Sequence, residues 1–358
     1  MNILIHYYRL GHYIGGAEVI ALNQCAEFIN QGHNITILTA DVGKRSKIFD
    51  EFIANHPSVK LVELPLIVPA KTGDTWTDID IESYLFGKYA AEHFYAGNTE
   101  PFDIVVIHNK TDALFIPNHY KTVIHLHGSP EQFDNLMEIA LYNANGLLAV
   151  SESVKDAWTA NIKSLRRPIS VIHNGVDSSI FKNTNQRRDI DVLFVGRLYP
   201  HKGILELLKA ATTHNFNLVV VGAGPLEAEI AKYSHVQHYK NVSTEELTRF
   251  YNRAKVFACP SSAKEGVLTT MLEAAMCGCA IITTNCAGMV DFAKHEYNSL
   301  LVPPKDVKAL SNAITELLND YAKRAQIAKC AEYEAVNNWN IQRQTNKLLD
   351  FYKSIICE

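Results

Sequence analysis

Two cationic side chains, Arg197 and Lys202, stand close together in a loop predicted between a strand at 191–195 and a helix at 203–212. Backbone N–H groups at the start of a helix attract anions, and two cations beside them could together hold a diphosphate. The loop lacks the G-x-x-x-x-G-K-[ST] pattern of a Walker-type phosphate loop. A solvated basic turn is the alternative, and under both interpretations we expect the two side chains to face solvent.

Two carboxylates follow in the segment 261–278, where a helix is predicted over 266–276. Glu265 and Glu273 are separated by seven residues, which is roughly 12 Å along a helix axis, so one ligand of nucleotide-sugar size could touch both. Glu265 could instead only stabilise the positive end of the helix dipole. Glu273 lies among apolar residues, and its carboxylate must therefore be paired or hydrogen-bonded.

A glycine pair, Gly15 and Gly16, separates the strand predicted at 2–7 from the helix predicted at 17–30. Because these residues have no side chains, the N–H groups at the helix start could approach an anion. The loop does not match the G-x-G-x-x-G pattern of dinucleotide-binding proteins, which disfavours a nicotinamide cofactor. A simple turn without a ligand is the alternative.

Two histidines, His125 and His127, end the strand predicted at 121–127, and alternation places them on the same face of the sheet. Two imidazoles could begin a metal site, but no third ligand is adjacent in the sequence, so a metal is not expected. His127, beside Gly128, could hydrogen-bond a substrate. A structural histidine is equally compatible with the sequence.

Short apolar runs alternate with helical segments along the chain, which predicts an α/β protein with mainly parallel sheets covered by helices on both faces. The polar stretch 183–189 predicts an exposed linker between two such units. Capping-box spacing at Ser153/Asp156 and Ser243/Glu246 predicts two helix starts. The apolar runs predict strands at 2–7, 34–39, 102–108, 121–127, 146–150, 169–172, 191–195, 218–221, 255–259 and 280–283.

The composition of the 358 residues excludes several classes of protein. With 47% hydrophobic and 20% charged residues, the chain is not mainly disordered. A net charge of −4 argues against a general nucleic-acid-binding protein. The seven cysteines are scattered, and Cys277 and Cys279 have C-x-C spacing, so we expect reduced thiols rather than disulfides or a metal site.

The sequence shows neither a signal peptide nor a run of about 20 apolar residues. We therefore expect a cytoplasmic protein, and the sequence leaves peripheral contact with a membrane open.

Taken in order, these segments resemble the retaining glycosyltransferases of family 4, also called glycosyltransferase group 1. The resemblance covers nearly the whole chain and depends on several motifs in the same order. It implies the GT-B fold, an α/β architecture in which two Rossmann-like parallel-sheet domains face a cleft. The matching residues are Gly15-Gly16-Ala17-Glu18, His127, His173-Asn174-Gly175-Val176-Asp177, Gly196-Arg197-Leu198 with Lys202-Gly203, Glu265, and Glu273-Ala274-Ala275-Met276-Cys277-Gly278.

The resemblance also implies a domain organisation. An N-terminal acceptor-binding domain would span residues 1–172, and residues 173–190 would form a linker. A C-terminal domain at 191–335 would bind the nucleotide sugar. The remaining residues, 336–358, would form a helix that crosses back to the first domain.

The implied activity is transfer of a hexose-type sugar from a nucleotide-diphosphate sugar to an acceptor hydroxyl, with retention of configuration and with UDP favoured over GDP. No metal or other cofactor is implied. The acceptor would be a glycan, a lipid-linked molecule or a small molecule in glycan, cell-envelope or glycoconjugate synthesis. A nucleotide-sugar epimerase of related fold and a non-catalytic glycan- or nucleotide-binding protein are the alternatives.

The resemblance assigns parts of the donor to particular residues. The Gly16 N–H group and the Arg197 and Lys202 cations would hold the diphosphate, and Glu273 would accept hydrogen bonds from the ribose. The implied donor-binding residues are Gly15, Gly16, Asn174, Arg197, Lys202, Tyr239, Lys240, Glu265, Leu268, Thr269 and Glu273, with Tyr239 and Lys240 near the base.

The implied catalytic residues are Arg197, Lys202, Glu265 and His127. Glu265 would hold hydroxyls of the transferred sugar, and His127 would contact that sugar near the reaction centre. The chain departs from the family pattern at Leu268, where the family often has glycine. The departure at Asp291, where the family often has glutamate, is smaller.

Overall fold

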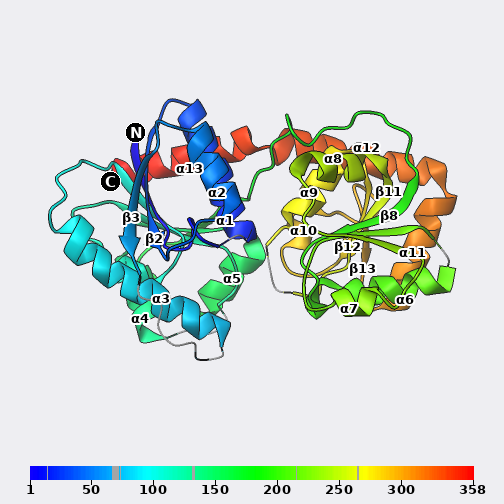
Figure 1. The fold of residues 1–358 in the computed structure, drawn as a ribbon, viewed down its shortest axis with the longest axis horizontal. Coiled ribbons are helices and arrows are strands. Elements are labelled where there is room, and N and C mark those ends of the chain that lie inside the picture. The colour runs from blue at the N-terminus through cyan, green and yellow to red at the C-terminus, as the bar shows by residue number, and fades with distance from the viewer. Residues whose placement is uncertain (14, 67–71, 73, 131–133, 215, 264–265) are drawn as a thin grey trace. The chain divides into compact units, whose positions relative to one another are not determined.

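The computed structural model describes residues 1–13, 15–66, 72, 74–130, 134–214, 216–263 and 266–358. The chain forms two compact units; in Figure 1 the first is coloured blue to green with a red C-terminal helix, and the second green to orange. The first unit comprises Met1–His173 and the C-terminal Gln344–Glu358, and the second comprises Asn174–Arg343. The last helix, α13 (Ile341–Ile356), therefore returns the chain to the first unit.

The first unit contains a seven-stranded sheet in which every adjacent pair is parallel. Its spatial order is β3 (Lys60–Pro65), β2 (Asn34–Asp41), β1 (Asn2–His6), β4 (Ile104–Ile107), β5 (Thr122–Leu126), β6 (Gly146–Ala149) and β7 (Ile169–Val171). Its other helices are α1 (Gly16–Asn30), α2 (Lys47–Asn55), α3 (Thr75–Ala90), the π-helix η1 (Ala91–Tyr95), the 3₁₀ helix η2 (Thr111–Phe115), α4 (Asn135–Asn143) and α5 (Glu152–Asn161).

The second unit contains a six-stranded parallel sheet. Its order is β10 (Val236–Tyr239), β9 (Leu218–Val221), β8 (Ile190–Val195), β11 (Ala254–Cys259), β12 (Ala280–Thr284) and β13 (Leu300–Val302). Its helices are the 3₁₀ helix η3 (Pro200–Lys202), α6 (Ile204–His214), α7 (Glu227–Ile230), α8 (Thr244–Arg253), α9 (Thr269–Met276), α10 (Met289–Phe292), α11 (Val307–Asn319) and α12 (Tyr321–Asn338).

Each sheet has an apolar layer on both of its faces. In β1, Leu4 belongs to one hydrophobic cluster, whereas Ile3 and Ile5 belong to another that also contains Tyr352 of α13. Alternate residues of β8 are divided between two clusters in the same way. Because side chains alternate across a strand, two covered faces require the continuous apolar runs on which the α/β prediction was based. The predicted pair of Rossmann-like parallel-sheet units is confirmed.

The strand order places a topological switch point in each sheet, between β1 and β4 in the first unit and between β8 and β11 in the second. In open parallel sheets, ligands bind beyond the carboxyl ends of the strands at such a point. The loop containing Gly15 and Gly16 follows β1, and the loop containing Arg197 follows β8. The fold therefore brings the predicted residues of each unit to that unit's expected binding edge.

The polar stretch expected as an exposed linker lies mostly in solvent but is anchored to the second unit. The Arg188 guanidinium donates hydrogen bonds to the Tyr251 carbonyl at 3.2 Å and the Cys277 carbonyl at 2.7 Å. The Thr184 N–H donates to the Asn252 side chain at 2.7 Å. These contacts make the stretch part of the second unit's surface.

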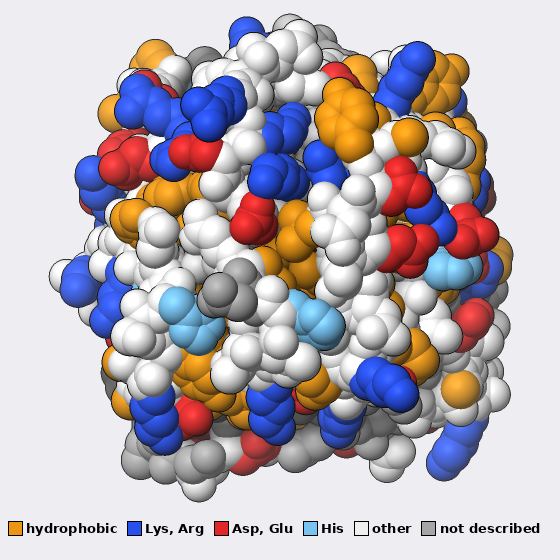
Figure 2. Space-filling view, turned by 90° about the vertical axis from the view of Figure 1, so that its right-hand side faces the viewer, with side chains coloured by type: hydrophobic (Ala, Val, Ile, Leu, Met, Phe, Trp, Pro, Cys, Tyr) orange, Lys and Arg blue, Asp and Glu red, His pale blue; other side chains and the backbone are white. Residues whose placement is uncertain are grey.

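The cysteines, the helix hydropathy and the surface charge of the described residues can be compared with what the composition predicts. All seven cysteines are free thiols, as predicted. No helix in the described part of the chain is both long and apolar enough to cross a membrane. The face in Figure 2, which belongs to the second unit, mixes positive and negative side chains and exposes only small hydrophobic areas. That mixture is typical of a solvent-facing protein surface.

Gly203 joins η3 to α6, and replacing it measures how closely the loop after β8 packs against Pro260. Its φ is +77°, and an added Cβ would lie 2.1 Å from the Pro260 carbonyl oxygen. We expect Gly203→Ala to lower the unfolding free energy by about 2 kcal/mol or more beyond the effect of Gly43→Ala. Gly43 has almost the same φ, +78°, but no described atom lies within 4 Å of its added Cβ. Equal losses in denaturant unfolding would show that the Pro260 contact is not tight.

Candidate functional site

The loop after β8 presents two cations in different surroundings. Arg197 is exposed, and its guanidinium carbon lies 5.5 Å from the centre of the Tyr199 ring. Lys202 ends η3 and is only 8% exposed. The expectation that both side chains face solvent is therefore right for Arg197 and wrong for Lys202. Burial of Lys202 follows from the tight turn at Gly203, which packs η3 against the loop after β11.

The end of β9 and the loop after it hold the backbone around Arg197. The Gly196 N–H donates to the Val221 carbonyl and the Leu198 N–H to the Ala223 carbonyl, both at 3.0 Å. An added Cβ on Gly222 would lie 2.0 Å from the Gly196 oxygen. This support was not predicted, although the glycine-rich segment directly after the strand predicted at 218–221 is a local signal for it.

The loops after β8 and β11 also hold each other. The Ser262 N–H donates to the His201 carbonyl at 2.8 Å, and the Ser261 hydroxyl donates to the same oxygen at 3.1 Å. These bonds bring the Lys202 turn beside the segment that leads into α9. The cations and α9 therefore belong to one local structure, although the sequence separates them widely.

Helix α9 begins at Thr269, three residues later than predicted. Leu268 is extended, with φ −69° and ψ 122°, and packs with Val267 on the hydrophobic core. Thr269 and Glu273 are four residues apart on this helix and therefore share a face. Glu265 lies outside the described residues, so its predicted place at the helix mouth stays a prediction.

Glu273 is hydrogen-bonded, as its apolar surroundings required. The Tyr251 hydroxyl donates to Glu273 Oε2 at 2.7 Å. Burial raises the pKa of the Glu273 carboxyl to about 7, against the opposing effect of the Tyr251 hydrogen bond. The group can therefore change its charge near neutral pH, which is typical of functional carboxylates.

The predicted base-contacting residues lie at the edge of the second sheet. Tyr239 ends β10 and is 39% exposed, and the Lys240 ammonium forms an ion pair with Glu227. Strand β9 separates β10 from β8. Asn174, the first residue of the second unit, is buried. The turn containing Lys202 is thus hydrogen-bonded to the loop after β11, whereas Tyr239 and Lys240 lie at and just after the edge strand β10.

Of the glycine pair in the first unit, only Gly16 has the open space that its predicted role requires. Gly15 is the N-cap of α1, and an added Cβ there would lie 2.7 Å from Glu18 Oε2. No described atom lies within 4 Å of an added Cβ on Gly16. The backbone at Gly16 is therefore open to a close approach, whereas Gly15 is covered by the Glu18 carboxylate.

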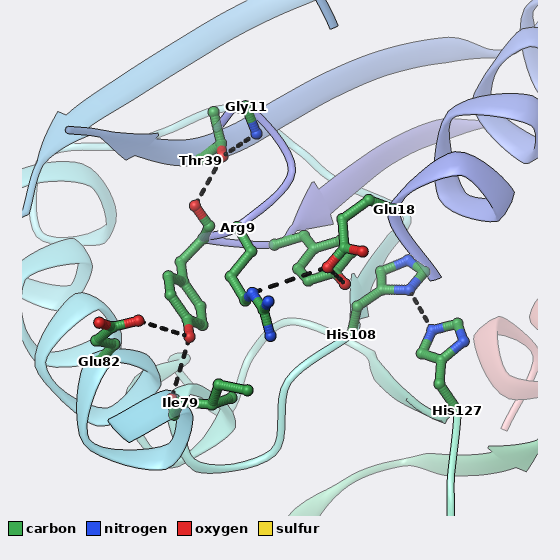
Figure 3. Close-up of polar contacts among 10 residues, drawn as sticks. Arg9, Gly11, Glu18, Thr39, Ile79, Glu82, His108 and His127 are labelled. Carbon is green, nitrogen blue, oxygen red and sulfur yellow. Dashed lines mark hydrogen bonds and ion pairs between the residues drawn. The ribbon is translucent and has the colours of Figure 1, made fainter. Parts of the chain in front are cut away.

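A polar network lies beside this pair, and Figure 3 shows its Arg9 and Glu18 side chains. The Tyr7 hydroxyl donates to Glu18 Oε1 at 2.5 Å, and the Arg9 guanidinium lies 3.8 Å from the same oxygen. Arg9 also lies over the Tyr13 ring at 3.8 Å. Arg9 could not be recognised from the sequence, because its approach to Glu18 depends on the folded path of the loop.

Three histidines converge at the carboxyl ends of β4 and β5. His108 Nδ1 and His127 Nε2 are 2.8 Å apart and hydrogen-bonded, as Figure 3 shows. His125 Nε2 is hydrogen-bonded to the Tyr352 hydroxyl at 2.8 Å. His125 and His127 lie on one face, as alternation predicts, and the neighbouring strand adds His108. Sequence analysis missed His108, because pairing of β4 with β5 is long-range information.

All three imidazoles are neutral at pH 7. Burial lowers the pKa of His125 to about 3, and it lowers that of His127 to about 4 with a smaller contribution from the Lys110 charge. Burial also lowers the pKa of His108 well below its usual range. Neutral imidazoles each offer one hydrogen-bond donor and one acceptor nitrogen.

Two family models match the chain. The model described as Glycosyltransferase Family 4 matches residues 14–180, and the model described as Glycosyl transferases group 1 matches residues 176–333. Together they extend over most of both units.

Individual proteins give the same classification. The uncharacterized glycosyltransferase MJ1607 of Methanocaldococcus jannaschii is 25% identical over 240 residues, which cover 60% of this chain and 61% of that protein. The capsular polysaccharide biosynthesis glycosyltransferase CapM of Staphylococcus aureus is 26% identical over 251 residues, which cover 62% of this chain and 65% of that protein. The chain thus spans less than two thirds of the length of either relative.

A solved structure extends the similarity in fold to the full chain. HepE of Anabaena, solved in complex with UDP, matches with a TM-score of 0.77 and 18% identity over 99% of this chain and 100% of that one. The sheet order, the two matched models and this likeness agree. The chain belongs to the family 4, group 1 glycosyltransferases and has their GT-B fold.

Proposed function

We propose that the protein transfers a sugar from a nucleotide-diphosphate sugar to an acceptor hydroxyl in glycan or cell-envelope synthesis. The observation that carries this proposal is the grouping in the second unit. Arg197 and Lys202 follow β8 at the switch point, and the adjoining loop leads into α9 with its half-buried Glu273. A cationic site beside a hydrogen-bonding carboxylate suits a diphosphate joined to a ribose.

Arg197 and Lys202 would hold the donor diphosphate without a metal. As the bond to the sugar breaks, negative charge grows on the leaving phosphate. Fixed cations stabilise that charge more in the transition state than in the ground state, and this difference accelerates the reaction. Burial of Lys202 strengthens its electrostatic effect because water screens it less.

Glu273 and Thr269 would hold the nucleotide. The shared face of α9 lets the Glu273 carboxylate accept from ribose hydroxyls while Thr269 lies toward the phosphates. We propose UDP as the nucleotide, since HepE was solved with UDP. Glu265 would hold hydroxyls of a hexose, and retention of configuration is part of the same proposal.

The first unit would hold the acceptor, which is a glycan, a lipid-linked molecule or a small molecule. His127 would contact the transferred sugar as a neutral hydrogen-bonding group, because its lowered pKa keeps it uncharged at pH 7. The hydrogen bond to His108 sets the direction of its ring. The N–H groups at the start of α1 would contact the donor phosphates.

A donor screen tests this proposal. Thermal-shift measurements with UDP- and GDP-sugars should show one series that raises the melting temperature, because a bound ligand stabilises the folded state by RT ln(1 + [L]/Kd). The selected donor should then release nucleoside diphosphate only together with a glycosylated acceptor or hydrolysed sugar. Binding without any turnover across a broad acceptor panel would favour a non-catalytic binding protein.

Gly16 provides a test of the phosphate contact in the first unit. We expect Gly16→Ala to lower kcat/KM by about tenfold or more, because the added methyl group would keep a phosphate from the N–H groups. The melting temperature should stay within a few degrees, since the added Cβ has open space. Gly97→Ala is the matched control: an added Cβ on Gly97 also has no described atom within 4 Å, and Gly97 is distant from Gly16 in the sequence. Equal activities of the two variants would remove Gly16 from the site.

A further inference from the structure

The three-histidine cluster offers more than the hydrogen bond between His108 and His127. One ring nitrogen from each of His108, His125 and His127 lies within 4.8 Å of the other two. His108 and His125 are buried, and His127 is half-buried. The cluster thus has an enclosed side and one side from which an ion could enter.

The distances suit a small transition-metal ion. Zinc binds imidazole nitrogens at 2.0–2.1 Å, so tetrahedral ligand nitrogens lie about 3.4 Å apart. His108 Nδ1 and His127 Nε2, now 2.8 Å apart, would separate by roughly 0.6 Å on binding. The hydrogen that they share would move to the other nitrogen of its ring, and no net proton would be released. His125 offers a nitrogen within 4.8 Å of the other two, and ring movement must bring it to about 3.4 Å.

The surroundings also resemble those of a metal site. Tyr352, which is fully buried in α13, hydrogen-bonds His125 Nε2 and so orients that ring from behind. Metal-bound histidines almost always have such an outer partner on the other nitrogen. The Lys110 ammonium, whose charge acts on His127, lies 3.9 Å from Asp80, which offsets that charge. The Tyr7 ring stacks on His108 at 4.8 Å and limits its movement.

We propose that His108, His125 and His127 form a binding site for zinc or a similar divalent transition-metal ion, with water as the fourth ligand. The site is inhibitory rather than catalytic, because a bound ion withdraws His127 from the sugar. This second statement rests on the proposed transferase function, whereas the binding site itself does not. A micromolar supply of zinc would thereby reduce transfer reversibly.

Direct metal binding tests the site without any assay of transfer. The chelator-treated full chain is titrated with Co²⁺, whose tetrahedral complexes absorb strongly in the visible range, and with Zn²⁺ by calorimetry. We expect one ion per chain. His125→Gln should weaken binding about a hundredfold or more, and Tyr352→Phe roughly ten- to a hundredfold. His119→Gln, at an exposed histidine outside the cluster, should bind like the wild type.

Two further measurements keep the proposal falsifiable if a buried variant fails to fold. Zinc X-ray absorption on the wild-type chain should show three imidazole ligands, and fewer than two would overturn the site. Zinc should inhibit transfer, EDTA should restore it, and His125→Gln should keep its activity but lose the inhibition. If zinc binds but transfer is undiminished, only the inhibitory role is wrong. If the chain binds zinc but has no transferase activity, only the proposed function is contradicted.

Discussion

Replacing Arg197 with alanine is expected to lower kcat/KM for sugar transfer by about 10²–10³ while leaving the melting temperature almost unchanged. Removal of one donor that stabilises developing negative charge typically has an effect of this size. The side chain is exposed, so its loss opens no cavity in the core. Steady-state kinetics with the selected donor, together with thermal unfolding, measure both quantities.

Lys202 needs a different substitution because it is buried. Lys202→Met keeps most of the apolar stem and removes only the ammonium group, so a loss of activity would report on charge rather than packing. Arg249→Ala is the control, since Arg249 is an exposed guanidinium of the same unit that pairs with Glu245 at 2.5 Å. Unchanged transfer in the Arg197→Ala/Lys202→Met double variant would exclude these cations as the diphosphate site.

Glu273→Gln is expected to weaken nucleoside diphosphate binding roughly ten- to a hundredfold at pH 8, because a hydrogen bond to a charged group is lost. At pH 6 the difference from the wild type should be small. The wild-type carboxyl has a pKa of about 7, so it is mostly protonated at pH 6 and is then a weak acceptor, much like the amide. Calorimetric titrations across this range give the affinities.

The comparison between variant and wild type matters, because phosphate groups also titrate, with a pKa of about 6. That contribution is common to both proteins and cancels in the ratio of their affinities. Glu265→Gln is the companion variant: it should leave nucleoside diphosphate affinity nearly unchanged but lower kcat, since its proposed contact is on the transferred sugar. If the ratio of wild-type to Glu273→Gln affinity for nucleoside diphosphate does not vary with pH, the ribose contact is refuted.

The central strands of both sheets could be predicted from the sequence, and of the four edge strands only β7 could. Strands such as β1 and β8 are covered on both faces and are therefore continuous apolar runs. The missed strands β3, β10 and β13 are all at sheet edges. In β3 and β10 no residue is fully buried, so their composition carries a weaker hydrophobic signal.

Helix starts show where local signals are sufficient. The predicted capping box at Ser243 and Glu246 is confirmed. The cap predicted at Ser153 is wrong, because the Ser151 hydroxyl accepts from the Val154 N–H and starts α5 two residues earlier. The delayed start of α9 has a tertiary cause, since Val267 and Leu268 pack extended on the core. Spacing alone does not reveal such packing.

Candidate site residues could be proposed from the sequence where motifs are local and not where strands bring distant residues together. Arg197, Lys202 and Glu273 each followed from a strand end or an unusual carboxylate. His108 and Arg9 did not, because their partners, His127 and Glu18, are reached through strand pairing and a folded loop. The burial of Lys202 was missed for the same reason.

The most direct test of the central claim is a mass balance of the reaction. Purified protein is incubated with the selected nucleotide sugar and an acceptor panel in the presence of EDTA, and the products are followed by NMR and mass spectrometry. We predict one nucleoside diphosphate released per glycoside formed, with the anomeric configuration of the donor retained, and almost no product from Arg197→Ala. Formation of free nucleotide with an epimerised sugar, or full activity of Arg197→Ala, would contradict the account.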